Sequence, residues 1–176
     1  MTSSPLVKWD CRWPDPVALQ VAAERVLATL SPNHPDINPQ LWVQARLTPP
    51  RDELPSAILI TPWAVERIYW HLPGTLPSIQ SATPLQVDEA GRVAKGQGVI
   101  LRGKEKTIPV LIAWEPETGH HFVQTILHQV THLNSNESAM AAALAQENPG
   151  IHVPRSVSSR LEQPMDRRGL FRLFRS

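Results

Sequence analysis

Histidines in the second half of the sequence have the residue type and part of the spacing of a metal site. His121, His128 and His132 are separated by seven and four positions, so on a helix they would share one side, and His120 lies next to them. Imidazole nitrogens at such a spacing can bind zinc or nickel. No glutamate stands in the HExxH position, so the motif of a zinc hydrolase is incomplete. We therefore expect a polar helix face without bound metal, and keep a metal-handling face over His120 to His132 as the alternative.

Motifs for covalent catalysis and for nucleotide binding are missing from the sequence. It contains no GxSxG elbow, no P-loop and no GxGxxG. Gly96-Gln97-Gly98 precedes an expected strand instead of following one, which is the wrong context for phosphate. Cys11, the single cysteine, has no histidine near it in the sequence. We expect a protein without enzymatic activity and without a cofactor, although a hydrolase site built from residues distant in the sequence stays open.

Tryptophan is the aromatic residue that this chain favours. There are 6 tryptophans against 1 tyrosine and 3 phenylalanines. Trp63 follows Thr61-Pro62 at the end of an aliphatic run, and Trp70 lies in the same short segment. A rigid turn that presents a tryptophan suits a protein contact, because tryptophan buries much area at little entropic cost. The alternative is that Trp63 is a core residue beside a strand end. We expect Thr61, Pro62, Trp63 and Trp70 to bind a partner.

The C-terminal segment is basic. Residues 155–176 carry a net charge of +4, so the rest of the chain carries −3 and the whole chain +1. Arg167, Arg168 and Arg172 lie in a stretch that reads like a twin-arginine export signature. No apolar region follows it, so it is not expected to direct export. It is either a basic amphipathic tail or an imitation of a signal peptide.

The overall composition describes a globular protein. The 176 residues are 41% hydrophobic and 19% charged, and the 18 prolines predict short elements with stiff connections. The small net charge gives no reason to expect nucleic acid or stable membrane association. A single cysteine and the lack of an N-terminal signal favour a cytoplasmic protein.

Apolar periodicity predicts an α+β fold in one domain, a small and mainly antiparallel sheet packed against two or three helices. A helix begins at Asp15-Pro16 and ends near Leu30. The later elements expected are strands at 41–47, 57–60, 99–101 and 108–114, helices at 119–133 and 137–146, and an ambiguous segment at 64–72. We expect an N-terminal extension over residues 1–14, the domain over 15–150, and a basic tail over 151–176 that is mobile.

Four segments together resemble a known family. They are Asn38-Pro39-Gln40-Leu41-Trp42-Val43, Ile58-Leu59-Ile60-Thr61-Pro62-Trp63, Pro73-Gly74, and Arg167-Arg168-Gly169-Leu170-Phe171-Arg172. In order and spacing they resemble the nickel–iron hydrogenase assembly chaperones of the HybE/HupJ type. The resemblance spans roughly residues 15–175, and the Thr-Pro-Trp element is its most specific part.

The resemblance implies a non-enzymatic accessory protein of the cytoplasm. Such chaperones hold hydrogenase structural subunits until cofactor insertion is complete, before twin-arginine export. The implied partners are precursors of the large subunit, the small subunit or both, with the twin-arginine signal peptide as a further candidate. Thr61, Pro62 and Trp63 carry over as the interaction element, and Arg167 and Arg168 as the basic motif. We also hypothesise that the tail occupies the chaperone's own signal-binding groove when no partner is present.

Overall fold

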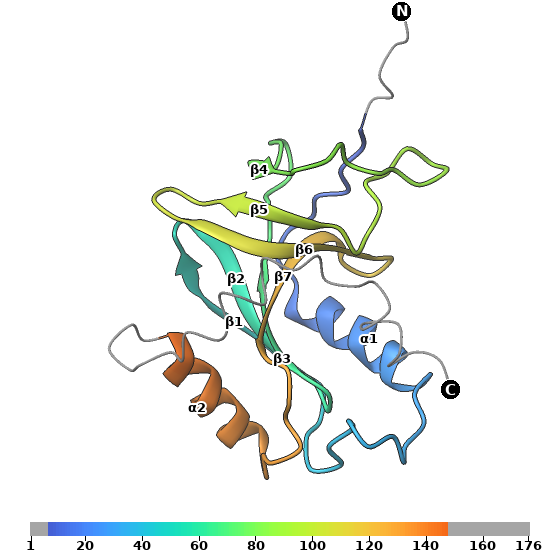
Figure 1. The fold of residues 1–176 in the computed structure, drawn as a ribbon, viewed down its shortest axis with the longest axis vertical. Coiled ribbons are helices and arrows are strands. Elements are labelled where there is room, and N and C mark those ends of the chain that lie inside the picture. Colours follow the sequence, from blue (N-terminus) through green and yellow to red (C-terminus); the bar gives the residue numbers. More distant parts are fainter. Residues whose placement is uncertain (1–6, 148–176) are drawn as a thin grey trace, which may run out of the picture.

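The structure is a computed structural model and describes residues 7–147 (Figure 1). Seven strands form one sheet in the order β1-β2-β3-β7-β6-β5-β4, and every neighbouring pair is antiparallel. In chain order the elements are α1 (Pro16–Leu27), β1 (Gln44–Arg51), β2 (Leu54–Ile60), β3 (Val65–Tyr69), β4 (Ile79–Gln80), β5 (Gly98–Arg102), β6 (Thr107–Glu115), β7 (Gly119–Leu127) and α2 (Asn136–Glu147). The α+β class and the antiparallel sheet are therefore confirmed.

The first helix begins where the sequence predicts. The Asp15 carboxylate accepts hydrogen bonds from the backbone N–H groups of Val17 and Ala18 at 2.9 and 3.1 Å, and Pro16 fills the first turn. These bonds satisfy two donors that every helix start leaves free. The helix ends at Leu27, one turn earlier than the apolar pattern suggested.

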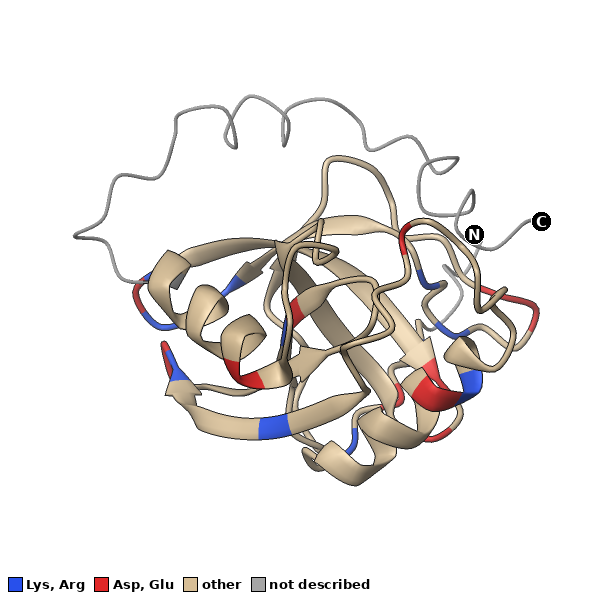
Figure 2. Cartoon of the chain, turned by 90° about the horizontal axis from the view of Figure 1, so that it is seen from below, with Lys and Arg blue, Asp and Glu red and all other residues tan. Residues whose placement is uncertain are grey.

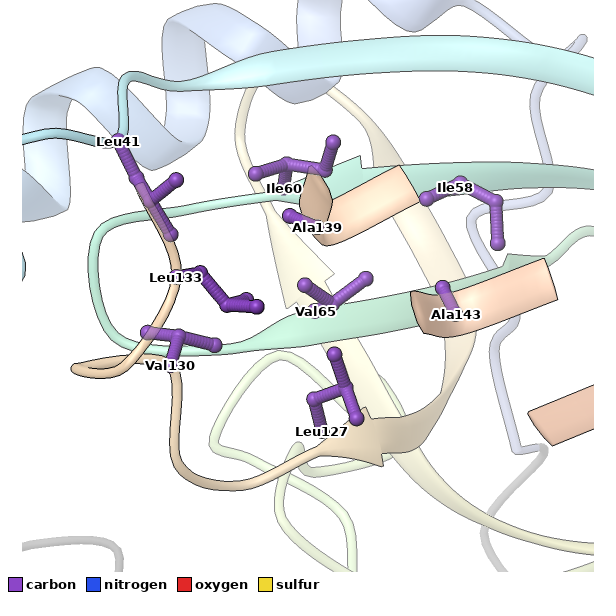
Figure 3. Close-up of a cluster of buried hydrophobic side chains, with 9 residues drawn as sticks. All are labelled: Leu41, Ile58, Ile60, Val65, Leu127, Val130, Leu133, Ala139 and Ala143. Carbon is purple, nitrogen blue, oxygen red and sulfur yellow. The ribbon is translucent and has the colours of Figure 1, made fainter. Parts of the chain in front are cut away.

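The two helices cover opposite faces of the β1-β2-β3-β7 half of the sheet. Strand β2 shows this directly, because its side chains alternate between the faces. Ile58 and Ile60 point to α2 and join a cluster with Ala139 (Figure 3). Ala57 and Leu59 point to α1 and pack in a second cluster with its residues, among them Leu19 and Ala23. Because both faces of β2 are buried, residues 57–60 form a continuous apolar run in the sequence.

The β5-β6 half of the sheet has its own core, which connecting segments cover. Leu101, Val110, Ile112 and Phe122 are buried there, with Trp9 of the N-terminal segment packed against them. The sheet also curls, so that the β1–β2 turn meets the β5–β6 turn. The carboxylate of Asp52 accepts the backbone N–H groups of residues 105 and 106 at 2.8 to 3.1 Å.

The predicted helix over Gly119 to Leu133 is wrong, because residues 119–127 form strand β7. Phe122 and Val123 are adjacent apolar residues that the sheet buries on opposite faces, one in each core cluster. A strand covered on both faces produces apolar neighbours that imitate a helical stripe. The β-branched residues Val123, Thr125 and Ile126 favour a strand. The described residues thus contain two helices, not three.

Other predicted elements are confirmed with small shifts. The hairpin of β5 and β6, strand β2 and helix α2 lie where expected, and the ambiguous segment 64–72 contains strand β3. The first strand begins at Gln44 instead of Leu41. Within the predicted N-terminal extension, Lys8 pairs with Arg92 at the edge of the fold. The predicted tail over 151–176 lies outside the described residues.

Candidate interaction surface

Thr61-Pro62-Trp63 forms the tight turn between β2 and β3. The hydroxyl of Thr61 accepts the Ala64 N–H at 3.1 Å and donates to the Ala64 carbonyl at 3.0 Å, and the Thr61 N–H bonds that carbonyl at 2.9 Å. Thr61 is fully buried and Pro62 is buried, whereas Trp63 is half-buried. Side chain and backbone together lock the turn, so Trp63 is held at its tip in one orientation of the main chain.

The segment before β1 is joined to this turn by Asn38. The backbone N–H of Asn38 donates to the Pro62 carbonyl at 2.8 Å. Its amide nitrogen donates to the carbonyls of Val130 and Leu133 at 2.8 and 2.6 Å, and its amide oxygen accepts the Gln40 N–H at 2.9 Å. Asn38 is 4% exposed, and one buried amide thus ties together three parts of the chain.

A second buried asparagine fixes Trp42 in the same region. Asn136, 1% exposed, accepts the Trp42 N–H at 3.2 Å and donates to the Trp42 carbonyl at 3.1 Å. The indole of Trp42 stays 52% exposed. The main chain of Trp42 is therefore fixed while its ring faces solvent.

We name residues 38–42 and 61–64 together the aromatic end of the sheet. Neither segment contains a charged residue or a histidine. Both are motif segments, and the structure brings them side by side although about twenty positions separate them in sequence. Aromatic rings on uncharged segments whose main chain is fixed, with polar backbone around them, can bind an apolar partner segment. The two segments contain no titratable side chain, and the Thr61 hydroxyl is buried and hydrogen-bonded.

Sequence reasoning missed the two asparagines that assemble this surface. The available signals were Asn38 directly before a proline, in one of the segments that carry the family resemblance, and Asn136 at the interruption of an apolar pattern. Both are nearly fully buried polar residues, and a single sequence does not reveal burial of that kind.

Trp70 lies at the other end of β3 and is 1% exposed. Seven positions separate it from Trp63, which along an extended strand is about 23 Å. Trp63 and Trp70, both expected to bind a partner, therefore do not lie on one surface, because a strand places its two ends far apart. Trp70 packs with Leu19 and Ile68 under α1 and borders a small cleft.

The four histidines do not share one face. Strand β7 directs His120 and His121 to opposite sides of the sheet, and His128 and His132 are exposed beyond the end of the strand. His120 Nδ1 accepts the Asp10 N–H at 2.8 Å, so the proton sits on Nε2, which donates to the Val93 carbonyl at 2.8 Å. Burial lowers the pKa of His120, and it lowers the pKa of His121 to about 4. Within residues 7–147, no three histidine, cysteine or carboxylate side chains gather in a metal-binding group.

Charges of both signs are mixed over the described part of the chain (Figure 2). Arg25 pairs with Glu115 and Glu117 at 2.6 and 2.8 Å, and Lys95 also reaches Glu115. The predicted basic contacts Arg167, Arg168 and Arg172 lie outside the described residues. No helix among residues 7–147 has the length and apolar character that a membrane span requires.

Comparisons with known proteins place this fold. The search of curated proteins returned no match. A solved structure, the solution structure of HybE from Escherichia coli, matches with a TM-score of 0.52 over 85% of this chain and 91% of that chain, at 12% sequence identity. At that identity the match shows a shared fold. A family model described as NiFe-hydrogenase assembly, chaperone, HybE matches residues 16–173. Since the match covers most of the sequence, the chain belongs to the HybE family of NiFe-hydrogenase assembly chaperones.

Proposed function

We propose that this protein binds hydrogenase structural subunits as precursors in the cytoplasm, during nickel–iron hydrogenase maturation and before twin-arginine export. The proposal includes the large subunit, the small subunit or both as clients, and it requires no catalysis and no cofactor. Family membership supports the general role in assembly.

The aromatic end is the observation that supports a specific binding surface. A client that is still incompletely assembled exposes apolar area, and the matching surface is a fixed aromatic patch without charge. Trp42 and Trp63 supply the rings, and Asn38 and Asn136 hold the main chain under them. Because the main chain under the rings is fixed before binding, a client loses less affinity to ordering of the chaperone.

The basic C-terminal segment would add an electrostatic contribution. Arg167, Arg168 and Arg172 belong to a segment of +4, opposite in sign to the −3 of the remaining chain and to any acidic client surface. Exposed charge contacts weaken with salt, because the screening length falls from about 10 Å at 0.1 M to about 3 Å at 1 M. Removing residues 166–176 should therefore lower client affinity at low salt and leave it unchanged at high salt. If that segment instead occupies the signal-binding groove, its removal should raise the affinity for a signal-bearing precursor.

The metal-handling alternative receives no support from the described residues. Two of its four histidines are buried and hydrogen-bonded, and the other two are exposed in a loop without a third ligand.

The test is capture of hydrogenase subunits from cells that express them, by the tagged full chain and its variants. Wild type should retain an unprocessed subunit in a stoichiometric complex, and Trp63→Ala should lose most of it. Leu76→Ala is the matched control, since Leu76 is an apolar residue 78% exposed in a loop away from the aromatic end. If Trp63→Ala and Leu76→Ala lose the captured subunit equally, or both retain it, the aromatic end is not the client-binding surface. If wild type captures no hydrogenase subunit, the proposed function itself fails.

A further inference from the structure

A cleft of about 120 Å³ lies at the end of β3 opposite the aromatic end. It is bordered by the segment before α1, by the β6–β7 turn and by the end of β3. The lining residues are Arg12, Trp13, Asp15, Trp70, Glu117 and Thr118. The cleft is large enough for several waters or for a small peptide group.

Trp70, which borders the cleft, has a hydrogen-bond donor without an acceptor. Trp70 is 1% exposed, and its indole N–H has no acceptor among the described residues. Yet no polar side-chain atom in residues 7–147 is both fully buried and unpaired. The indole nitrogen must therefore keep a small accessible area, and Trp70 borders this cleft. A nearly buried donor of this kind favours a ligand that brings an acceptor.

The charged groups at the rim are held by other partners. Arg12 donates to both oxygens of Asp10 at 2.8 and 2.9 Å and to the Pro116 carbonyl at 2.8 Å. Glu117 pairs with Arg25 through both carboxylate oxygens, at 2.8 and 3.1 Å. Asp15 is the cap of α1. The rim is thus fixed in position before any ligand arrives.

These groups select the charge of the occupant. A cation would be attracted by the carboxylates of Asp15 and Glu117 but repelled by the Arg12 guanidinium, and for an anion the signs are reversed, so neither charge is favoured by all the groups present. A neutral amide satisfies both the donor and the carboxylates, because its carbonyl accepts from Trp70 while its N–H can donate to a carboxylate at the rim.

Trp13 supplies the apolar part of the site. Its side chain is 68% exposed although it borders the cleft, so one face of a large ring has no cover among the described residues. The adjoining chain is anchored, because the Asp10 N–H donates to His120 Nδ1 and the His120 N–H donates to the Asp10 carbonyl. Gly119 also leaves no room for a side chain against that carbonyl. Trp13 is therefore presented from a fixed segment, as an aromatic wall beside the donor.

We propose that this cleft binds the main-chain amide of an extended client segment, with the carbonyl on the Trp70 indole N–H and an apolar side chain against Trp13. This rests on the proposed chaperone function and adds a second contact, at the opposite end of β3 from the first. It recognises neutral peptide backbone, so it suits many client sequences.

The test uses ¹⁵N-labelled full-length protein and three small probes. N-acetyl-leucine N-methylamide is neutral, N-acetyl-leucine is an anion, and leucine N-methylamide is a cation. The readout is the indole cross-peak of Trp70, assigned by its loss in Trp70→Phe. The neutral probe should shift this peak saturably, with millimolar affinity. Trp13→Ala should weaken that binding about fivefold, the effect of about 1 kcal/mol for an aromatic contact. Val17→Ala, also strongly exposed and one turn further along, should bind as wild type.

Three results would overturn the inference: no saturable shift, a stronger effect of either charged probe, or unchanged binding by Trp13→Ala. The probes contain no hydrogenase sequence, so this outcome is independent of whether the protein captures a hydrogenase subunit. If the captured precursor binds wild type and both Trp13→Ala and Trp70→Phe equally well, the cleft is not a client contact, and the proposed function stands on the aromatic end alone.

Discussion

The two ends of strand β3 are built with different chemistry. At the aromatic end, the chain segments are held by the amides of Asn38 and Asn136, which do not titrate. At the cleft end, they are held by imidazoles: His120 bonds the main chain of Asp10 and Val93, and His121 contacts Thr118. Both ends use nearly buried polar side chains to fix a tryptophan-bearing segment. Only one of them should respond to pH.

The geometry of each end depends on the side chains that hold it, amides at the aromatic end and imidazoles at the cleft end. An amide presents donor and acceptor at every pH, so the aromatic end keeps its geometry until the side chain is removed. A neutral imidazole that accepts an N–H through Nδ1 loses that bond when it is protonated. The cleft end is therefore the part of the fold that acid should loosen first.

The largest effect should come from Asn38→Ala. It leaves the carbonyls of Val130 and Leu133 buried without their donor, and we expect the free energy of unfolding to fall by about 3 kcal/mol. Chemical denaturation measures this. Gln40→Ala is the control, because Gln40 is exposed and uses only its backbone N–H in this network. If Asn38→Ala lowers the free energy of unfolding by less than about 1 kcal/mol, the hydrogen bonds of the Asn38 amide do not hold the aromatic end together.

Acid should affect the cleft end next most strongly. The pKa of His121 is about 4 in the folded chain against an ordinary value of 6.5, so the unfolded chain takes up the proton first as the pH falls. Its contribution to stability is complete above pH 6.5 and is lost toward pH 4, by about 3 kcal/mol. His120 acts in the same direction, because burial lowers its pKa against the opposing effects of the Val93 hydrogen bond, Asp10 and Asp88.

Amide hydrogen exchange measures this difference locally. Between pH 6.5 and 4, after correction for the intrinsic exchange rate, protection should fall at Asp10 and His120, which bond each other, and stay constant at Asn38 and Thr61. His128→Gln is the control, since that exposed histidine should leave the profile unchanged. An equal loss of protection at both ends would contradict the predicted difference in their response to acid.

A smaller, opposite effect should come from Glu66 in the middle of the sheet. Burial raises the pKa of Glu66 to about 7, and the strand places it between Leu59 and Thr125. The folded chain retains the proton that the unfolded chain gives up, so stability falls as the pH rises from 4.5 to 7. Glu66→Gln should stabilise the protein by about 1 to 2 kcal/mol at pH 8, an estimate lowered for the partial exposure of the side chain, and by nothing at pH 4. Thermal unfolding at the two pH values checks this, and equal changes at both would contradict it.

The sequence predicts those elements of the fold that are determined by residues close together in the chain, such as a helix cap or an alternating strand. Asp15-Pro16 marks the start of α1 because a cap acts on its own helix. The hairpin of β5 and β6 follows from alternation next to a charged turn. Strand β7 was predicted as a helix because a strand buried on both faces has lost its period of two, and Phe122 next to Val123 then imitates a helical stripe.

Only the local part of the candidate site, the turn that presents Trp63, was predictable from the sequence. Thr61-Pro62-Trp63 identifies a rigid turn, since threonine and proline act within three residues. That Asn38 reaches this turn, and that Asn136 fixes Trp42, depends on contacts between residues more than 20 positions apart, and hydrogen-bond partners at that distance leave no local pattern. The same limit applies to Trp70, because neither burial nor the cleft beside it is visible in the spacing of tryptophans.

The central claim is that Trp42 and Trp63, from two distant segments, form one client-binding surface. A double-mutant cycle tests it most directly, with the affinity of the full chain for an unprocessed hydrogenase subunit measured for wild type, Trp42→Ala, Trp63→Ala and the double variant. Each single change should weaken binding about tenfold or more, and the double variant should lose less than the sum of the two free energies, with a coupling of about 1 kcal/mol. If either single variant binds the subunit as tightly as wild type, the two segments do not form one surface.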